Sequence, residues 1–125
     1  MKFLALIYTG EREWDALSDD ERGAIYGRYR ALMQDDRFAG GDELAPTATA
    51  TTVRVRDGET IVTDGPFVET KEALGGYFLI EAASMDEALD FAARIPGAAT
   101  GAVEVRPCHV DESAEQERRS EEVTA

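Results

Sequence analysis

Two segments of the chain are apolar at almost every position, and they constrain the fold more than any other feature. Residues 3–8 read FLALIY, and residues 77–82 read YFLIEA, with one charge. A strand of this pattern has both faces of its sheet covered, whereas a half-exposed strand alternates apolar and polar residues. Both faces of the predicted sheet are therefore expected to be buried.

Two capping boxes predict two helices. In Ser18-Asp19-Asp20-Glu21 and in Ser84-Met85-Asp86-Glu87, the serine can accept an amide of the first turn while the glutamate reaches back. Apolar residues then recur at helical spacing and point to a core. They are Ile25, Tyr29, Leu32 and Met33 in the first helix, which ends before Gly40-Gly41, and Ala88, Phe91, Ala92 and Ile95 in the second, which ends at Pro96-Gly97.

A hairpin is predicted around Asp57-Gly58, because this dipeptide suits the positive φ angles of a type I′ turn. A two-residue loop pairs residue 56 with 59, 55 with 60 and 53 with 62. Val53, Val55 and Val62 are then expected to share a buried face, with Arg54 and Arg56 facing outward. A loop follows from Asp64 to Leu74 and ends at Gly75-Gly76.

With a last strand at residues 102–106, the order is strand, helix, hairpin, strand, helix, strand. This order predicts an α+β fold, a ferredoxin-like antiparallel sheet with two helices on one face and an extra hairpin strand. Two helices cover only one face of a sheet. The other face is therefore expected to meet a second subunit in a two-fold homodimer.

Charge and length narrow the class of protein. The 125 residues suit one domain, predicted at 1–110, followed by an acidic C-terminal tail at 111–125 that is either a solvated helix or disordered. The net charge is −13; six acids and two arginines give the tail −4, which leaves −9 for residues 1–110. Such acidity argues against direct contact with nucleic acid or anionic membranes, but allows a basic protein partner or a small ligand.

The single cysteine, Cys108, excludes an internal disulfide and a Cys-based zinc site, and fits a reducing compartment. The first apolar run is too short for a secretory signal, and no run is long enough to span a membrane. A cytoplasmic protein is expected, without a cofactor and without a metal site, since no His–carboxylate ligand spacing occurs.

The segment TDGPFVETKEALGGYFLIE, residues 63–81, resembles the signature of the DGPF proteins in the YCII-related family. Residues 1–8, 48–54, 86–88 and 103–107 are similar to the same family, so the resemblance covers nearly everything up to Pro107. It implies a dimer of the dimeric α+β barrel type with a cleft near the subunit interface. An Asp and a His approach each other in the cleft of some YCII-related proteins, which suggests enzymes, and genes of DGPF proteins often neighbour those of sigma factors.

The resemblance does not extend to Cys108-His109 or to the tail, and the chain has no early His where some family members carry one. Neighbours on an extended segment point to opposite faces, so Cys108 and His109 form neither a catalytic pair nor a metal pair. A surface role is expected for His109. The antiparallel topology also carries it away from Asp64 within one subunit.

Asp64 is the candidate catalytic residue, because a carboxylate at the mouth of a cleft acts as a general base when burial raises its pKa. The alternative is that its side chain caps the turn before Gly65-Pro66. Lys71 is either a hook for a ligand carboxylate or a solvated lysine paired with a glutamate. Aromatic residues near this edge, including Trp14 and Tyr26, suggest either a pocket or simple packing. The predicted ligand-binding residues are Tyr8, Gly65, Pro66, Phe67, Glu69, Lys71 and Tyr77.

These features support three hypotheses. The first is a homodimer that binds a small organic molecule beside Asp64, with acid–base chemistry on that molecule if the protein is an enzyme. The second is a non-catalytic interaction or regulatory module, linked to sigma-factor-associated transcription and acting through protein contacts. In the third, the loop merely latches the dimer.

Overall fold

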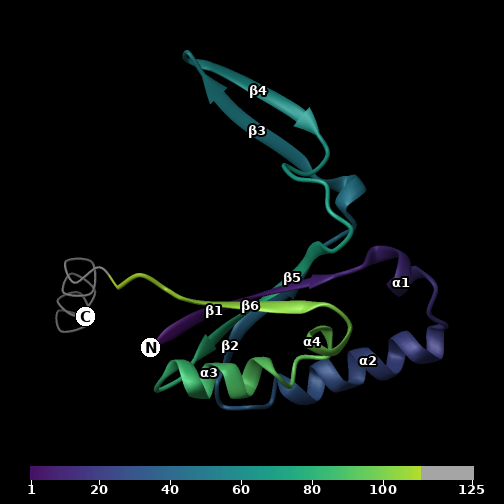
Figure 1. The fold of residues 1–125 in the computed structure, drawn as a ribbon, viewed down its shortest axis with the longest axis vertical. Helices are drawn as coiled ribbons and strands as arrows, with labels where there is room; N and C mark the ends of the chain where they lie inside the picture. Colours follow the sequence, from purple (N-terminus) through teal and green to yellow (C-terminus); the bar gives the residue numbers. More distant parts are fainter. Residues whose placement is uncertain (111–125) are drawn as a thin grey trace, which may run out of the picture.

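A computed structural model describes residues 1–110, in which one sheet carries helices on one face (Figure 1). The predicted α+β, ferredoxin-like arrangement is confirmed, and the sheet is antiparallel with the order β2-β5-β1-β6. The predicted tail at 111–125 lies outside the described residues. The sheet strands are β1 (Lys2–Thr9), β2 (Phe38–Glu43), β5 (Ala73–Glu81) and β6 (Ala102–Pro107).

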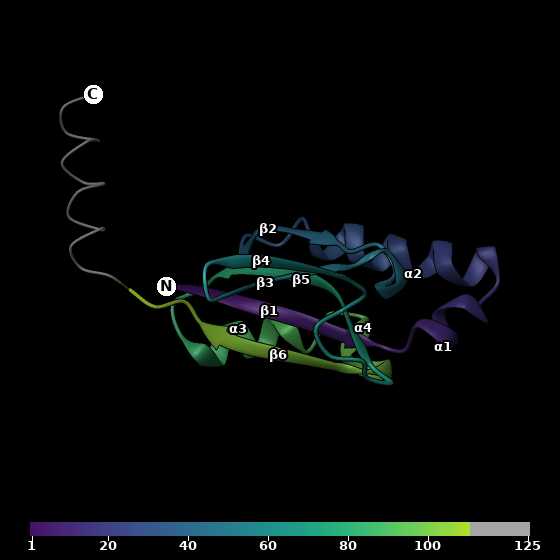
Figure 2. The same ribbon diagram turned by 90° about the horizontal axis from the view of Figure 1, so that it is seen from above.

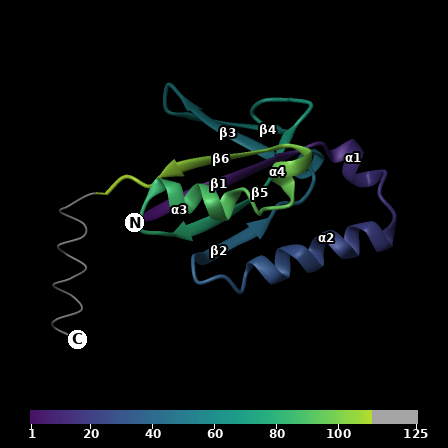
Figure 3. The ribbon, with the colours of Figure 1, turned by 60° about the horizontal axis from the view of Figure 1, so that its bottom comes forward.

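The helical elements are α1 (Glu11–Asp15), α2 (Asp19–Leu32), the 3-10 turn η1 (Thr47–Thr49), α3 (Met85–Ala92) and α4 (Gly97–Thr100). Figure 3 shows α3 and α4 over one face of the sheet, and Figure 1 shows α2 on the same side. Among residues 1–110, no helix is long and apolar enough to cross a membrane.

Both predicted helices begin at their serine caps. The Ser18 box is complete, because the Glu21 amide donates to Ser18 Oγ (3.1 Å) and the Ser18 amide donates to Glu21 Oε1 (3.0 Å). The Ser84 cap is also confirmed, but its glutamate accepts from the Ala83 amide (3.0 Å).

The fourth strand of the sheet is β2, a segment that the sequence pattern did not predict. Its Gly40 and Gly41 were expected beyond the end of a helix, and Gly75 and Gly76 were expected to close a loop; all four lie inside strands. Close approach of the two strands is the reason: a Cβ on Gly41 would lie 2.3 Å from the Tyr77 carbonyl oxygen, and one on Gly76 would lie 3.0 Å from that of Asp42.

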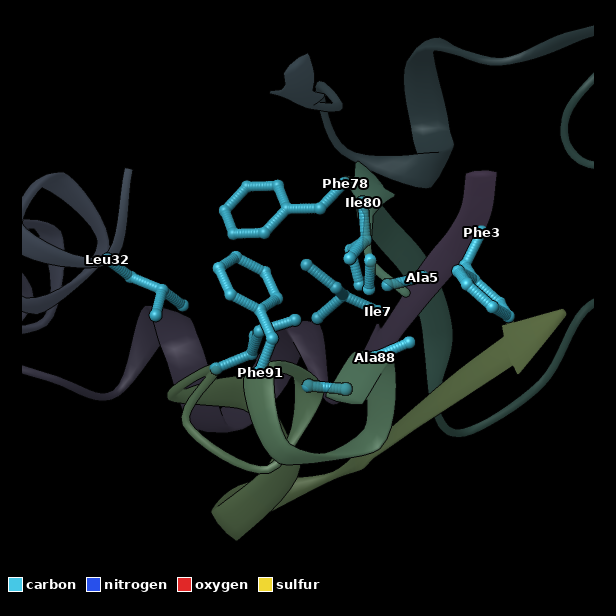
Figure 4. Close-up of a cluster of buried hydrophobic side chains, with 11 residues drawn as sticks. Phe3, Ala5, Ile7, Leu32, Phe78, Ile80, Ala88 and Phe91 are labelled. Carbon is cyan, nitrogen blue, oxygen red and sulfur yellow. The ribbon is translucent and has the colours of Figure 1, made fainter. Parts of the chain in front are cut away.

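The core lies between the sheet and the helices (Figure 4). Phe91 of α3 is completely buried, and Phe78 of β5 packs edge-on against Phe38 and Tyr29. Leu32 and the predicted stripe of α3 are buried, whereas Met33 stays 38% exposed because it lies at the C-cap of α2, where the helix leaves the sheet. The buried residues are Phe3, Ala5, Ile7, Leu32, Phe78, Ile80, Ala82, Ala88, Phe91, Ala92 and Ile95.

The hairpin of β3 (Thr51–Arg56) and β4 (Glu59–Asp64) has the predicted register but not the predicted place. It forms a separate two-stranded sheet, which we call the arm, and it stands off the main sheet on the side away from the helices (Figure 1). The prediction of an extra hairpin strand in the sheet is therefore wrong. The expected burial of Val53, Val55 and Val62 is also wrong for one chain, since each is about 60% exposed.

Among residues 1–110, no helix lies over the second face of the main sheet. Leu4 and Leu6 of β1 and Tyr77 and Leu79 of β5 alternate with the core residues and remain partly exposed. We call this surface, which includes Tyr8, the open face. The two strands that are apolar at nearly every position are therefore buried on one face only within one subunit.

Candidate functional site

The loop after the arm borders a hollow of about 400 Å³. Its walls come from three parts of the chain that are distant in sequence: α1, η1 and the stretch from the loop into β5. Cavities of this size suit small ligands. The lining residues are Glu11, Arg12, Glu13, Thr47, Thr70, Lys71 and Ala73.

Glu11 joins the first two walls. Its carboxylate accepts the Thr47 amide at 2.7 Å and the Thr47 hydroxyl at 2.9 Å. Both carboxylate oxygens are therefore engaged by one residue, a charge-assisted pair that holds η1 against α1. Glu11 therefore positions one wall of the hollow.

The third wall is shaped within the loop, where the Thr70 hydroxyl donates to the Glu72 carbonyl oxygen. This bond spans Lys71, which lines the hollow between them. No ion pair forms between Lys71 and an acid among the described residues, which removes the expected glutamate pairing as an explanation for this lysine. Lys71 and Arg12 thus bring two cationic side chains to one hollow from different elements.

Asp64 lies elsewhere, at the base of the arm, where it pairs with Thr51. The next residue, Gly65, has a φ of +104°, and its amide donates to the Ala50 carbonyl oxygen at 2.7 Å. The Gly65 carbonyl oxygen accepts the Thr52 hydroxyl at 2.8 Å. Backbone groups and Thr52 therefore close this turn, and the Asp64 carboxylate makes no hydrogen bond with residues 1–110. The expected side-chain cap is not formed, and the carboxylate is exposed.

Tyr8 and Tyr77 lie on the open face, on the neighbouring antiparallel strands β1 and β5. Tyr8 pairs with Leu74 and Tyr77 with Leu6. A bulge between Ile7 and Tyr8 leaves Gly75 as the extra residue. Among the described residues, no hydrogen bond joins either tyrosine to Asp64.

The other predicted ligand-binding residues are divided between the arm and the loop. Phe67 is 71% exposed, and its ring lies under the Arg54 guanidinium, 4.9 Å from the centroid, in a cation–π contact. Pro66 is partly exposed and Glu69 is exposed. Of the eight predicted site residues, only Lys71 lines the hollow.

Trp14 and Tyr26, which were considered for an aromatic pocket, meet each other instead, edge to face at 5.3 Å between ring centroids. Arg22 lies 6.0 Å from the centroid of Trp14, and the Tyr26 hydroxyl donates to Glu43 Oε1 at 2.9 Å. Burial and this bond raise the pKa of Tyr26. These contacts are packing between α1, α2 and β2.

Residues Glu11, Arg12, Glu13 and Thr47 were missed as site residues. The segment that follows β1 is polar and acidic, and such a segment looks like any solvated turn. The one signal in the sequence was the position of Glu11 close after a strand that begins the fold, but its partner Thr47 is 36 residues away.

Cys108 and His109 lie beyond β6, where the Cys108 amide donates to the Lys2 carbonyl oxygen at 2.9 Å. Tyr8 is at the other end of β1. Within residues 1–110, no three His, Cys, Asp or Glu side chains are grouped to hold a metal ion.

Comparison with known proteins gives two findings. The model of the YCII-related domain matches residues 1–110. An uncharacterised protein of Rhizobium meliloti (strain 1021) is 43% identical over 113 residues, which cover 86% of this chain and 91% of that protein.

Proposed function

The chain belongs to the YCII-related family, and from this premise we propose that it is a homodimer that binds a small organic acid. The observation that carries the proposal is the approach of Arg12 and Lys71 to one hollow of about 400 Å³. Two cations from different elements can hold one carboxylate, and a hollow restricts the ligand by size.

The remaining lining residues favour an acid that also carries a hydrogen-bond donor. Glu13 adds a carboxylate to the rim, whereas Glu11 is occupied by Thr47. A ligand with a carboxylate at one end and a hydroxyl or ammonium group at the other would complement Lys71 and Glu13 together. A purely apolar ligand would leave these charges desolvated without partners.

The open face supports the dimer part of the proposal. Tyr8 and Tyr77 are partly exposed there, and an equivalent face of a second subunit would bury them. Asp64 is exposed at the base of the arm, and we place it, with Gly65, Pro66, Phe67 and Glu69, at the cleft that the dimer forms. If the protein transforms its ligand, Asp64 is the residue to act as acid or base, since burial in the dimer would supply the desolvation that one subunit lacks.

The test is a thermal-shift and calorimetric screen with mono- and dicarboxylic acids of two to eight carbons, with and without hydroxyl or amino groups. A binder raises the melting temperature with concentration. Lys71→Gln is expected to weaken the best binder about tenfold, near 1.4 kcal/mol, and Arg12→Gln to do the same.

Lys2→Gln is the matched control. It removes the same charge at a position that lies at the far end of β1. Equal affinities in all three variants would contradict the site. The same conclusion follows if no acid shifts the melting temperature of the wild-type protein.

A further inference from the structure

The arm presents an apolar face that no other part of residues 1–110 covers. The register pairs Val53 with Val62 and Val55 with Thr60, so the three valines share one face. They are 60%, 59% and 61% exposed. An isolated two-stranded hairpin is marginally stable in water, and a contiguous exposed apolar patch marks an interaction surface.

The opposite face of the arm is already partly occupied by the chain's own loop. Arg54 lies on that face, over the ring of Phe67 at 4.9 Å. Its neighbour Ile61 is less exposed than the valines, at 44%. The valine face is therefore the one left for a partner.

Two hydrogen bonds close the base of the arm. The Gly65–Ala50 backbone bond and the bond from the Thr52 hydroxyl to the Gly65 carbonyl close the two strands where they leave the body. The arm stands off on the side of the open face in Figure 1, and from above it overlies the sheet in Figure 2. One chain thus carries two unpartnered apolar surfaces on the same side.

We infer that a second copy of this chain covers both surfaces at once, with the two open faces stacked and each arm laying its valine face on the other subunit. A two-fold axis makes this possible, because each copy supplies the same pair of surfaces and receives the same pair. The inference rests on the homodimer of the proposed function and adds the arm to its interface.

Charge favours the arm as the contact between two acidic bodies. Residues 51–63 carry two arginines and two acids and have no net charge, whereas residues 1–110 as a whole carry −9. A neutral apolar segment gains buried area without adding to the repulsion between like-charged subunits. A basic protein partner would instead be expected to meet an acidic surface, which the valine face does not offer.

The experiment measures the dimer dissociation constant by sedimentation equilibrium for the full chain and for Val55→Glu and Val62→Glu. Each variant is expected to weaken the dimer more than tenfold, because a charge would be buried against the partner. Thr63→Glu is the matched control: it adds the same charge on the opposite face of the same arm and is expected to change the constant less than threefold. Circular dichroism checks that the body stays folded in all variants.

A second measurement does not depend on a disruptive substitution. In a Cys108→Ser background, an environment-sensitive dye on Val55→Cys is expected to shift to the blue over the concentration range of dimerisation, and a dye on Thr63→Cys is not. If the dye on position 55 responds to removal of residues 111–125 but not to concentration, the tail covers the arm, and the inference is overturned.

The outcomes separate the two proposals. A wild-type dimer whose constant is unchanged by Val55→Glu and Val62→Glu overturns the role of the arm and leaves the homodimer intact. A wild-type protein that is monomeric throughout overturns the homodimer itself, and the arm contact with it, but leaves acid binding at Lys71 to be judged by its own screen.

Discussion

Arg37 donates three hydrogen bonds to the carboxylate of Asp35, one from its backbone amide and two from side-chain nitrogens, each at 2.9 Å. The same guanidinium donates to Asp90 Oδ2 at 2.9 Å and to the Glu87 carbonyl oxygen at 3.1 Å in α3. Arg94 adds a bond to Asp35 at 3.1 Å. This network ties the turn between α2 and β2 to the helix that carries Phe91.

Asp35→Asn is expected to lower the free energy of unfolding by about 1–2 kcal/mol at pH 7, since charge-assisted bonds to a partly exposed group are lost. The side-chain bonds from Arg37 hold the pKa of Asp35 well below its usual range. Charged Asp35 therefore stabilises the fold above the unfolded-state pKa of about 3.9, and this contribution disappears as pH falls through the lowered folded-state pKa. Urea unfolding of the wild-type protein and of Asp35→Asn from pH 7 to pH 2 measures the difference between their free energies of unfolding. This difference is expected to shrink below about pH 4. Asp36→Asn is the control, because Asp36 is exposed; an equal loss in that variant would contradict the network.

Gly41→Ala is expected to destabilise the protein by about 3 kcal/mol or to prevent folding. Its φ is +152°, and an added Cβ would lie 2.3 Å from the Tyr77 carbonyl oxygen. Gly23→Ala in α2 is the matched substitution at an open position, where nothing lies within 4 Å of the new Cβ. It is expected to raise the free energy of unfolding by about 0.5–1 kcal/mol through helix propensity. Thermal unfolding of the two variants in parallel checks that the first is less stable and the second more stable than the wild-type protein. A stable Gly41→Ala protein would argue against the close packing of the β2 and β5 backbones.

Ser18→Ala is expected to cost about 1 kcal/mol of stability, because the amide of Glu21 loses its acceptor at the start of α2. The box also lowers the pKa of Glu21, mainly through its bond from the Ser18 amide. Ser18→Thr keeps the hydroxyl and is expected to retain most of the stability. Chemical denaturation distinguishes the two, and equal losses would point to packing instead of capping.

Asp64→Asn is expected to leave the stability of the subunit unchanged, since the carboxylate has no hydrogen-bond partner within residues 1–110. Under the proposed dimer cleft, the same variant weakens binding of the organic acid, or slows its turnover, without changing the dimer constant. Asp57→Asn, at the tip of the arm and tolerant of its φ of +51°, is the control. Titration calorimetry on both variants gives the comparison; indistinguishable affinities would remove Asp64 from the site.

The sequence alone was sufficient to predict the features that depend on residues close together in the chain. The two serine caps and the Asp57-Gly58 turn with its register were predicted, because capping and turn geometry act over a few residues. The family was also recognisable from residues 63–81. The strand β2 was not predicted, since its sequence FAGGDE is poor in strand-forming side chains. Its place in the sheet comes from glycines that let the backbone approach β5.

The candidate site likewise combines a residue that was predicted from the sequence with residues that only the fold brings together. Lys71 was among the predicted ligand-binding residues, but the Glu11–Thr47 contact that forms another wall joins residues 36 positions apart, which no local pattern records. The arm is the clearest case. Its internal pairing follows from the sequence, whereas its separation from the sheet, and with it the exposure of Val53, Val55 and Val62, follows from β2 occupying the edge of β5. Sequence alone determined which residues pair with their near neighbours. Only the tertiary structure decided which apolar faces remain open, because burial depends on which distant elements compete for the same surface.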